Sequence, residues 1–348
     1  MKIVVMCGGL SMERDVSISS GTLACKALRA AGHQAVLVDM FYGLEEYGCA
    51  PEELFEHLPP IKDVKIVAQE PDLDAIRASR KWKSPSMIGQ GVLEICQKAD
   101  VVFLALHGAC GEDGRIQAAL DLLGVKYTGS GYLGSAIAMD KDLTKQLAIA
   151  AGVKTPEWRM VEYSGRKPEE LAEELFLPCV VKPVDSGSSI GVSIAYTKAE
   201  LVKALAENEK LGRVMAEQYI DGREIDVGVL EDRALPSIEI IPKHGFYDYA
   251  NKYQAGAAEE ICPSPIDAET ERRLGELTLK VHRALKLGAY SRSDFKLDSN
   301  GEIWFIEINT LPGMTPTSLM PQEAAAVGID YQSLCVRLVE LALEGGNA

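Results

Sequence analysis

Short apolar runs that end in glycine alternate with helical repeats through the first third of the chain. The apolar runs lie at residues 3–6 and 101–106, and apolar side chains recur at helical spacing between residues 23 and 31. Strands that alternate with helices predict a parallel sheet with helices on its faces. The sequence therefore predicts an N-terminal α/β domain, which we place at residues 1–129.

The pattern changes twice beyond this domain. A helix at 140–151 and strands near 179–182 and 214–220 indicate a compact α+β unit, which we place at residues 130–220. Antiparallel strands follow, including a hairpin turned by Asn300-Gly301, a dipeptide typical of tight hairpin turns. A third domain is expected at residues 221–348. Residues 41–90, which hold five prolines, are expected to form a long insertion.

Composition excludes several classes of protein. The chain has 348 residues, with 36 Lys and Arg against 51 Asp and Glu, a net charge of −15. That balance disfavours nucleic-acid binding and electrostatic membrane binding. No apolar run is long enough to span a bilayer, and the first run is too short for a signal peptide. Eight scattered cysteines without Cys-x-x-Cys pairs indicate free thiols in the cytoplasm, not disulfides or a zinc site.

A lysine stands between an apolar strand and a turn rich in glycine and serine. Residues 180–192 read VVKPVDSGSSIGV. Small residues let backbone N–H groups approach a phosphate, and Lys182 supplies a positive charge. The Gly-Lys-Ser/Thr signature of a Walker loop is missing. The pattern by itself allows both a phosphate-binding loop and an ordinary hairpin turn.

Two carboxylates and an amide are expected to lie together on the predicted hairpin. Asp294 lies on one strand, and Glu307 and Asn309 lie two residues apart on the other, so that both point to one face. Magnesium prefers oxygen ligands of this kind. A solvated strand face is the alternative, which the apolar neighbours at 303–306 make less favourable. The pattern favours a metal site.

Four loops also carry candidate functional groups. Residues 8–14 and 107–114 follow strand ends, where open α/β sheets bind ligands, although His107 alone is a weak signal. Residues 8–14 lack the Gly-x-Gly-x-x-Gly spacing of a dinucleotide site, which disfavours an oxidoreductase. Gly313 follows the predicted metal strand and can bring its N–H close to a substrate. Residues 246–253 have the composition of a mobile lid, with an ordinary surface loop as the alternative.

Together these loops resemble the D-alanine–D-alanine ligases, which are members of the ATP-grasp superfamily. The matching segments, in the order of the family, are 8–21 (GGLSMERDVSISSG), 107–114 (HGACGEDG), 128–141 (TGSGYLGSAIAMDK), 180–192, 246–253 (FYDYANKY), 291–295 (SRSDF) and 306–319 (IEINTLPGMTPTSL). The resemblance implies a three-domain ATP-grasp fold, with ATP between the central and C-terminal domains. It also implies ATP-dependent ligation of two D-alanines through a D-alanyl phosphate, for peptidoglycan precursor synthesis.

The resemblance implies a role for individual residues. The residues expected to bind ATP are Lys141, Lys182 and Ser189, then Glu217, Gln218, Tyr219 and Ile220 at the adenine, and Glu224 at the ribose. The expected ligands of two Mg²⁺ ions, which Mn²⁺ can replace, are Asp294, Glu307 and Asn309. The expected catalytic residues are Glu13, Ser188, Tyr253, Arg292 and Gly313. The expected substrate-binding residues are His107, Lys252, Ser318 and Leu319.

Among the expected catalytic residues, Glu13 is to receive the ammonium of the first D-alanine. With Ser188 and Tyr253 it is also expected to form a hydrogen-bonded set near the second amino acid. Arg292 and the N–H of Gly313 are the expected oxyanion donors. Lys252 belongs to the expected lid, and Ser318 and Leu319 are expected near the carboxylate of the second substrate.

The second substrate stays open. The long insertion is similar to that of the larger ligases, which include the D-alanine–D-serine and D-alanine–D-lactate ligases of vancomycin resistance. Gln218 replaces a lysine common beside the adenine, whereas Tyr253 matches the tyrosine of ordinary dialanine ligases. A D-alanine sensor without activity is a further alternative, disfavoured by the intact set of charged residues. The family habit implies a homodimer that binds D-alanine and ATP, without nucleic acid or membrane.

Overall fold

The N-terminal body of the computed structural model is a parallel three-stranded sheet with the order β2-β1-β3. The structure describes residues 1–345 apart from 46, 62–70, 185–190 and 244–256. Residues 3–6 of the central strand are fully buried, because helices pack on the sheet. The expected parallel sheet is therefore confirmed. Its elements are β1 (Lys2–Cys7), β2 (Gln34–Asp39), β3 (Val101–Leu104), α1 (Arg14–Ala30), α4 (Val92–Lys98) and α5 (Arg115–Leu122).

The segment expected as an insertion packs beside this sheet. It contains two short helices, α2 (Glu53–Glu56) and α3 (Leu73–Ser79). Arg80 is almost fully buried; its guanidinium lies 4.1 Å from the centroid of the Phe41 ring and donates to the carbonyls of Trp82 at 3.0 Å and Ser86 at 2.8 Å. One arginine therefore organises a stretch that has little regular structure.

The central body is an antiparallel sheet with the order β4-β7-β5-β6. Its helix α9 begins with a capping box, in which Thr197 and Glu200 satisfy each other's backbone N–H groups. Val181, Leu201 and Ala216 lie in the core between sheet and helices. The elements are β4 (Trp158–Glu162), β5 (Cys179–Pro183), β6 (Ser193–Ala195), β7 (Arg213–Gln218), α8 (Pro168–Ala172), α9 (Lys198–Asn208) and the 3₁₀ helix η1 (Glu209–Leu211).

The C-terminal body is built on a larger antiparallel sheet with the order β11-β10-β8-β12-β13 and with β9 beside β8. Phe295 and Phe305 are fully buried and lie edge to face, with ring centroids 5.8 Å apart, against α11. The elements are β8 (Gly222–Leu230), β9 (Arg233–Ala234), β10 (Ile238–Pro242), β11 (Ala258–Ile261), β12 (Tyr290–Asp298), β13 (Ile303–Asn309), α11 (Ala268–Ala284) and α12 (Leu319–Ala326).

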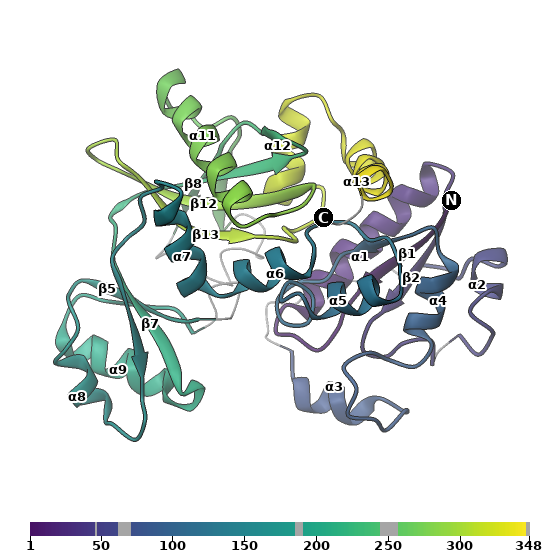
Figure 1. Cartoon of the computed structure of the whole chain (residues 1–348), viewed down its shortest axis with the longest axis horizontal. Coiled ribbons are helices and arrows are strands. Elements are labelled where there is room, and N and C mark those ends of the chain that lie inside the picture. Colours follow the sequence, from purple (N-terminus) through teal and green to yellow (C-terminus); the bar gives the residue numbers. More distant parts are fainter. Residues whose placement is uncertain (46, 62–70, 185–190, 244–256, 346–348) are drawn as a thin grey trace.

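Three helices link the bodies to one another (Figure 1). α6 (Tyr132–Met139) and α7 (Lys141–Ala150) precede the central sheet in the chain and pack against β13 of the C-terminal sheet. The last helix, α13 (Tyr331–Gly345), returns to the N-terminal body and packs against α1 and β3. No helix in the described part is both long and apolar enough to cross a membrane.

Candidate active site

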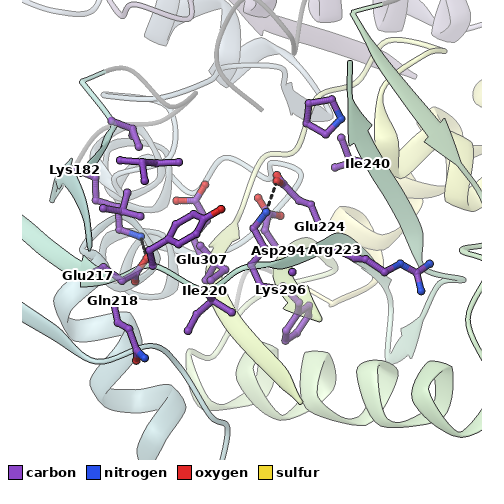
Figure 2. A pocket seen from close by; sticks show the side chains of 18 of the residues that line it. Lys182, Glu217, Gln218, Ile220, Arg223, Glu224, Ile240, Asp294, Lys296 and Glu307 are labelled. Atoms are coloured by element: carbon purple, nitrogen blue, oxygen red, sulfur yellow. Dashed lines mark hydrogen bonds and ion pairs between the residues drawn. The ribbon is translucent and has the colours of Figure 1, made fainter. Parts of the chain in front are cut away.

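A cavity of about 480 Å³ lies between the central and C-terminal sheets. Its walls are largely apolar and include Val180, Ile220 and Ile306. Charged side chains stand at its edges: in Figure 2, Lys182 and Glu217 lie on one side, Glu224, Asp294 and Lys296 on the other, and Glu307 between them. An apolar hollow with a few polar groups is typical of a small-molecule site.

One buried carboxylate holds two lysines at the central side of the cavity. The Lys182 Nζ donates to Glu217 Oε1 at 2.7 Å, and Lys145 forms an ion pair with the other oxygen. Burial acts to raise the pKa of Glu217, but the two ammonium groups outweigh it and lower that pKa. Burial likewise lowers the pKa of Lys145 to about 8. The pairing fixes Lys182 at the cavity wall.

Lys145 is a residue that the sequence analysis missed. It also donates to Thr155, whose hydroxyl donates to the Phe305 carbonyl at 2.8 Å, so it connects the central and C-terminal sheets. Its spacing of four residues from Lys141 on a helix was an available signal, because residues four apart share one helix face.

Seven of the residues expected at ATP line this one cavity: Lys141, Lys182, Glu217, Gln218, Tyr219, Ile220 and Glu224. The Nζ of Lys141 lies 3.6 Å from Glu307 Oε2, and that of Lys296 donates to Glu224 Oε2 at 3.0 Å. The Tyr219 ring meets Tyr196 edge-on, with centroids 5.4 Å apart. Ser189 lies outside the described residues.

The three expected metal ligands meet on adjacent strands. Asp294 pairs with Glu307 across β12 and β13, and Asn309 donates to the Asp294 oxygens at 3.3 and 3.4 Å. Among the described residues, no three His, Cys, Asp or Glu side chains come together as a metal-binding group. A cation here would therefore depend on the Asn309 amide and on ligands from outside the protein.

Arg292 forms ion pairs with two acidic side chains of this sheet, Asp294 and Asp226. Its Nε and Nη2 donate to Asp294 at 2.9 Å each, and Nε lies 3.0 Å from Asp226 Oδ2. Asp226 is 1% exposed, and burial followed by repulsion from Asp294 raises its pKa. The sequence analysis missed Asp226, although an acid between Ile225 and Val227 in a strand is an unusual placement.

A second buried acid lies beside the same strand. Glu323 of α12 is fully buried and accepts the Gly228 N–H at 2.9 Å. Gly228 leaves space for it, since a Cβ there would lie 2.5 Å from Glu323 Oε2. Burial raises the pKa of Glu323.

The N-terminal body contributes a loop cluster around His107. Both ring nitrogens are engaged: Nδ1 lies 2.9 Å from the Leu311 carbonyl and Nε2 lies 3.1 Å from Ser20 Oγ. Ser11 donates to the His107 carbonyl at 2.8 Å, and burial lowers the pKa of His107. This histidine therefore joins the N-terminal body to the loop that follows β13.

Glu112 makes a second connection between the same two loops. It accepts the Gly108 N–H at 2.9 Å and the Leu311 N–H at 3.0 Å. Glu13 lies on the other side of Gly108, where a Cβ would come within 2.6 Å of its carboxylate. Burial, then repulsion from Glu13, raises the pKa of Glu112 to about 8. The sequence analysis missed Glu112, because the segment alone does not reveal this long-range contact.

The loop after β13 holds the remaining described candidates. Ser318 Oγ accepts the Thr315 N–H at 3.1 Å, and a Cβ on Gly313 would lie 2.9 Å from that same oxygen. The Leu319 side chain packs with Ile238 and Ile240 and faces the core. Only the Leu319 backbone is thus suited to a ligand. Ser188, Lys252, Tyr253 and the expected lid at 246–253 lie outside the described residues.

The raised pKa of Glu112 predicts a specific dependence of stability on pH. The folded protein holds the proton up to about pH 8, whereas the unfolded chain releases it near 4.5. The contribution of this group is complete below pH 4.5 and is lost as pH rises toward 8. The free energy of unfolding of Glu112→Gln, measured from pH 5 to 8 and compared with that of the original protein, should therefore become relatively larger as pH rises. The exposed Glu56→Gln serves as the control, and parallel curves for Glu112→Gln would contradict the assignment.

Comparison with known proteins places this arrangement in a family. The family models described as D-ala D-ala ligase N-terminus and D-ala D-ala ligase C-terminus match residues 2–130 and 147–340. The D-alanine–D-alanine ligase of Pediococcus pentosaceus is 40% identical over 97% of both chains. That of Desulfotalea psychrophila is 48% identical over 70% of this chain and 79% of its own.

Solved structures agree with the fold. The D-alanine–D-alanine ligase from Bacillus anthracis complexed with ATP has a TM-score of 0.74 at 30% identity, covering 99% of this chain and 97% of its own. The VanG D-Ala:D-Ser ligase from Enterococcus faecalis has a TM-score of 0.73 at 28% identity, covering 98% and 99%. The expected ATP-grasp architecture, α/β followed by α+β, is therefore confirmed. The chain belongs to the D-alanine–D-alanine ligase family.

Proposed function

We propose that this enzyme uses ATP to join two molecules of D-alanine into D-alanyl-D-alanine, a building block of peptidoglycan precursors. The observation that carries the proposal is the cavity between the central and C-terminal sheets, which gathers seven candidate ATP residues next to the Asp294–Arg292 pair. Relatives that are D-alanine–D-alanine ligases match nearly the whole chain, at 38 to 40% identity.

The cavity suggests how ATP binds. Its apolar walls at Val180, Ile220 and Ile306 suit the faces of an adenine ring, and Glu224 suits the ribose hydroxyls. Lys141 and Lys182 bring two positive charges to the end near Glu307, where the phosphates belong. This orientation directs the terminal phosphate toward Asp294 and Arg292.

The oxygen ligands at this end suit magnesium. Asp294, Glu307 and Asn309 offer two carboxylates and an amide oxygen, the ligand chemistry that Mg²⁺ and Mn²⁺ accept together with phosphate oxygens and water. We propose that these residues hold two such ions. The ions would neutralise charge on the phosphates. Asp294 must then exchange its present bonds to Arg292 for the cation.

The charges around Asp294 and Arg292 suit a reaction in two steps. The carboxylate of the first D-alanine attacks the terminal phosphorus, which gives an acyl phosphate and ADP. The amine of the second D-alanine, once deprotonated, attacks the acyl carbon, and phosphate leaves as the peptide bond forms. We propose that Glu13 binds the first ammonium. Arg292 and the Gly313 N–H would stabilise the oxyanion of the second step.

We also propose roles for residues outside the ATP cavity. Ser188 and Tyr253 would complete the hydrogen bonds of Glu13, and Lys252 would belong to a lid that keeps water from the acyl phosphate. His107, Ser318 and the Leu319 backbone would border the D-alanine sites.

Domain limits at 129/130 and 220/221 and a homodimer stay predictions. The cytoplasm, which supplies ATP, suits the eight cysteines, all of them described and free.

Glu307→Gln should lower dialanine formation at least about 100-fold, since one charge is lost from the set that faces the phosphates. Phosphate release with D-alanine and ATP, titrated with Mg²⁺, measures this. The control is Glu302→Gln, on the same hairpin but paired with the exposed Lys154, which should keep full activity. Full activity of Glu307→Gln at ordinary magnesium concentrations would contradict the metal assignment.

The choice of second substrate is the other prediction. A site built around an amine discriminates against a hydroxy acid, because its polar groups are left unpaired, whereas an added hydroxyl is worth only about 1–3 kcal/mol of selectivity. Equal D-alanine, D-serine and D-lactate with ATP near neutral pH should therefore give mainly dialanine by mass spectrometry. A majority of alanyl-serine, as the VanG neighbour suggests as an alternative, or of depsipeptide would overturn this choice.

A further inference from the structure

The strand register places Asp226 next to the proposed catalytic arginine. β8 and β12 pair antiparallel, with Asp226 opposite Asp294 and Gly228 opposite Arg292. Residues two apart on a strand share a face, so all four positions lie on one side of the sheet. The guanidinium of Arg292 contacts Asp294 at 2.9 Å and Asp226 at 3.0 Å.

Asp226 is unsuited to bind a ligand directly. Its side chain is 2% exposed, and the described residues that line the cavity include Asp294 but not Asp226. Its Oδ1 has no hydrogen-bond partner in the described part of the chain. A buried carboxylate of this kind is costly without a charged neighbour, and the neighbour that it contacts is Arg292.

A cation bound at Asp294 would compete with Arg292 for the same carboxylate oxygens. Both of its oxygens accept N–H groups of Arg292, and both also accept the Asn309 amide. If Asp294 turns its oxygens to magnesium, Arg292 loses that anchor. The contact with Asp226 does not depend on Asp294, because it comes from the neighbouring strand.

We infer that Asp226 is a positioning residue: it holds the Arg292 guanidinium toward the reacting acyl group while Asp294 is engaged with metal and nucleotide. This inference rests on the proposed function, in which Arg292 stabilises the oxyanion. Asp226 itself touches no substrate. Its role is to keep a long, flexible side chain in one orientation, which is the part of catalysis that depends on preorganisation.

A double-mutant cycle tests this. Asp226→Asn keeps the shape and removes the charge, so kcat for dialanine should fall about 10- to 100-fold as the orientation of Arg292 is lost. The Kd of ATP without magnesium should stay within about twofold of the original, because Asp226 lies outside the cavity wall. In an Arg292→Lys background the same change should cost less than about threefold, since coupled residues are not additive.

Two further variants guard the interpretation. Asp226→Thr is a smaller uncharged replacement that should reproduce the loss if Asp226→Asn folds poorly. Glu271→Gln is the matched control: Glu271 of α11 accepts the N–H of Ser237, the residue before β10, at 2.9 Å, and no contact of it with Arg292 is found among the described residues. It should keep kcat within about twofold. Equal losses from Asp226→Asn in both arginine backgrounds, an unchanged kcat, or a loss confined to ATP affinity would each overturn the inference.

A measurement independent of turnover separates this inference from the proposed function. With ¹⁵N-labelled arginine, the Nε–H signal of Arg292, assigned from Arg292→Lys, reports the mobility of that group. After addition of ADP and Mg²⁺ it should stay rigid in the original protein and become mobile in Asp226→Asn. Equal rigidity in both would overturn the positioning role. Absence of dialanine from the original protein would instead overturn the proposed function.

Discussion

The guanidinium of Arg292 is the positive charge on which the acidic face of the C-terminal sheet depends. It lies within 3.0 Å of oxygens of both Asp294 and Asp226, which are almost fully buried. Removing a buried cation from such carboxylates typically costs about 3–5 kcal/mol. Because strand pairing dictates these neighbours, the pairing of β8 with β12 also determines the electrostatics of the site.

Buried acidic side chains with close partners are also found elsewhere around the site. Glu217 lies between Lys145 and Lys182 on the central side, so a buried acid holds one cation at the cavity wall and another behind it. Glu112 joins two loops through two backbone N–H groups, and its pKa is raised by burial and then by the proximity of Glu13. Elements from all three bodies therefore converge, from α1 near Glu13 to the loop after β13. Movement between the bodies would change these contacts together.

Local periodicity was sufficient for part of this arrangement. Alternation of strands and helices predicts the parallel N-terminal sheet, and the period of two along β13 places Glu307 and Asn309 together. The Asn-Gly turn predicts the hairpin that brings Asp294 opposite Glu307. Each of these features shows itself in a local pattern, such as the periodicity of one element or the chemistry of one turn, so the sequence reveals it.

Contacts between distant segments were beyond such reasoning. Arg80 organises its segment by donating to carbonyls, which leaves no pattern of side-chain types to recognise. Asp226 and Arg292 are brought together by strand order, and Glu112 reaches Leu311 across most of the chain. Lys145, four residues from Lys141 on one helix, and Asp226, an acid within an apolar strand, were missed although each had a local signal. The roles of the ligand-facing residues came from the resemblance to a family, not from spacing alone.

The account rests most directly on formation of an acyl phosphate between D-alanine and the terminal phosphate of ATP. D-Alanine labelled with ¹⁸O in its carboxylate, turned over with ATP and Mg²⁺, should transfer one labelled oxygen to each inorganic phosphate released, because the carboxylate oxygen that attacks phosphorus leaves with it. Mass spectrometry of the phosphate measures this. Unlabelled phosphate formed in step with dialanine would contradict the account.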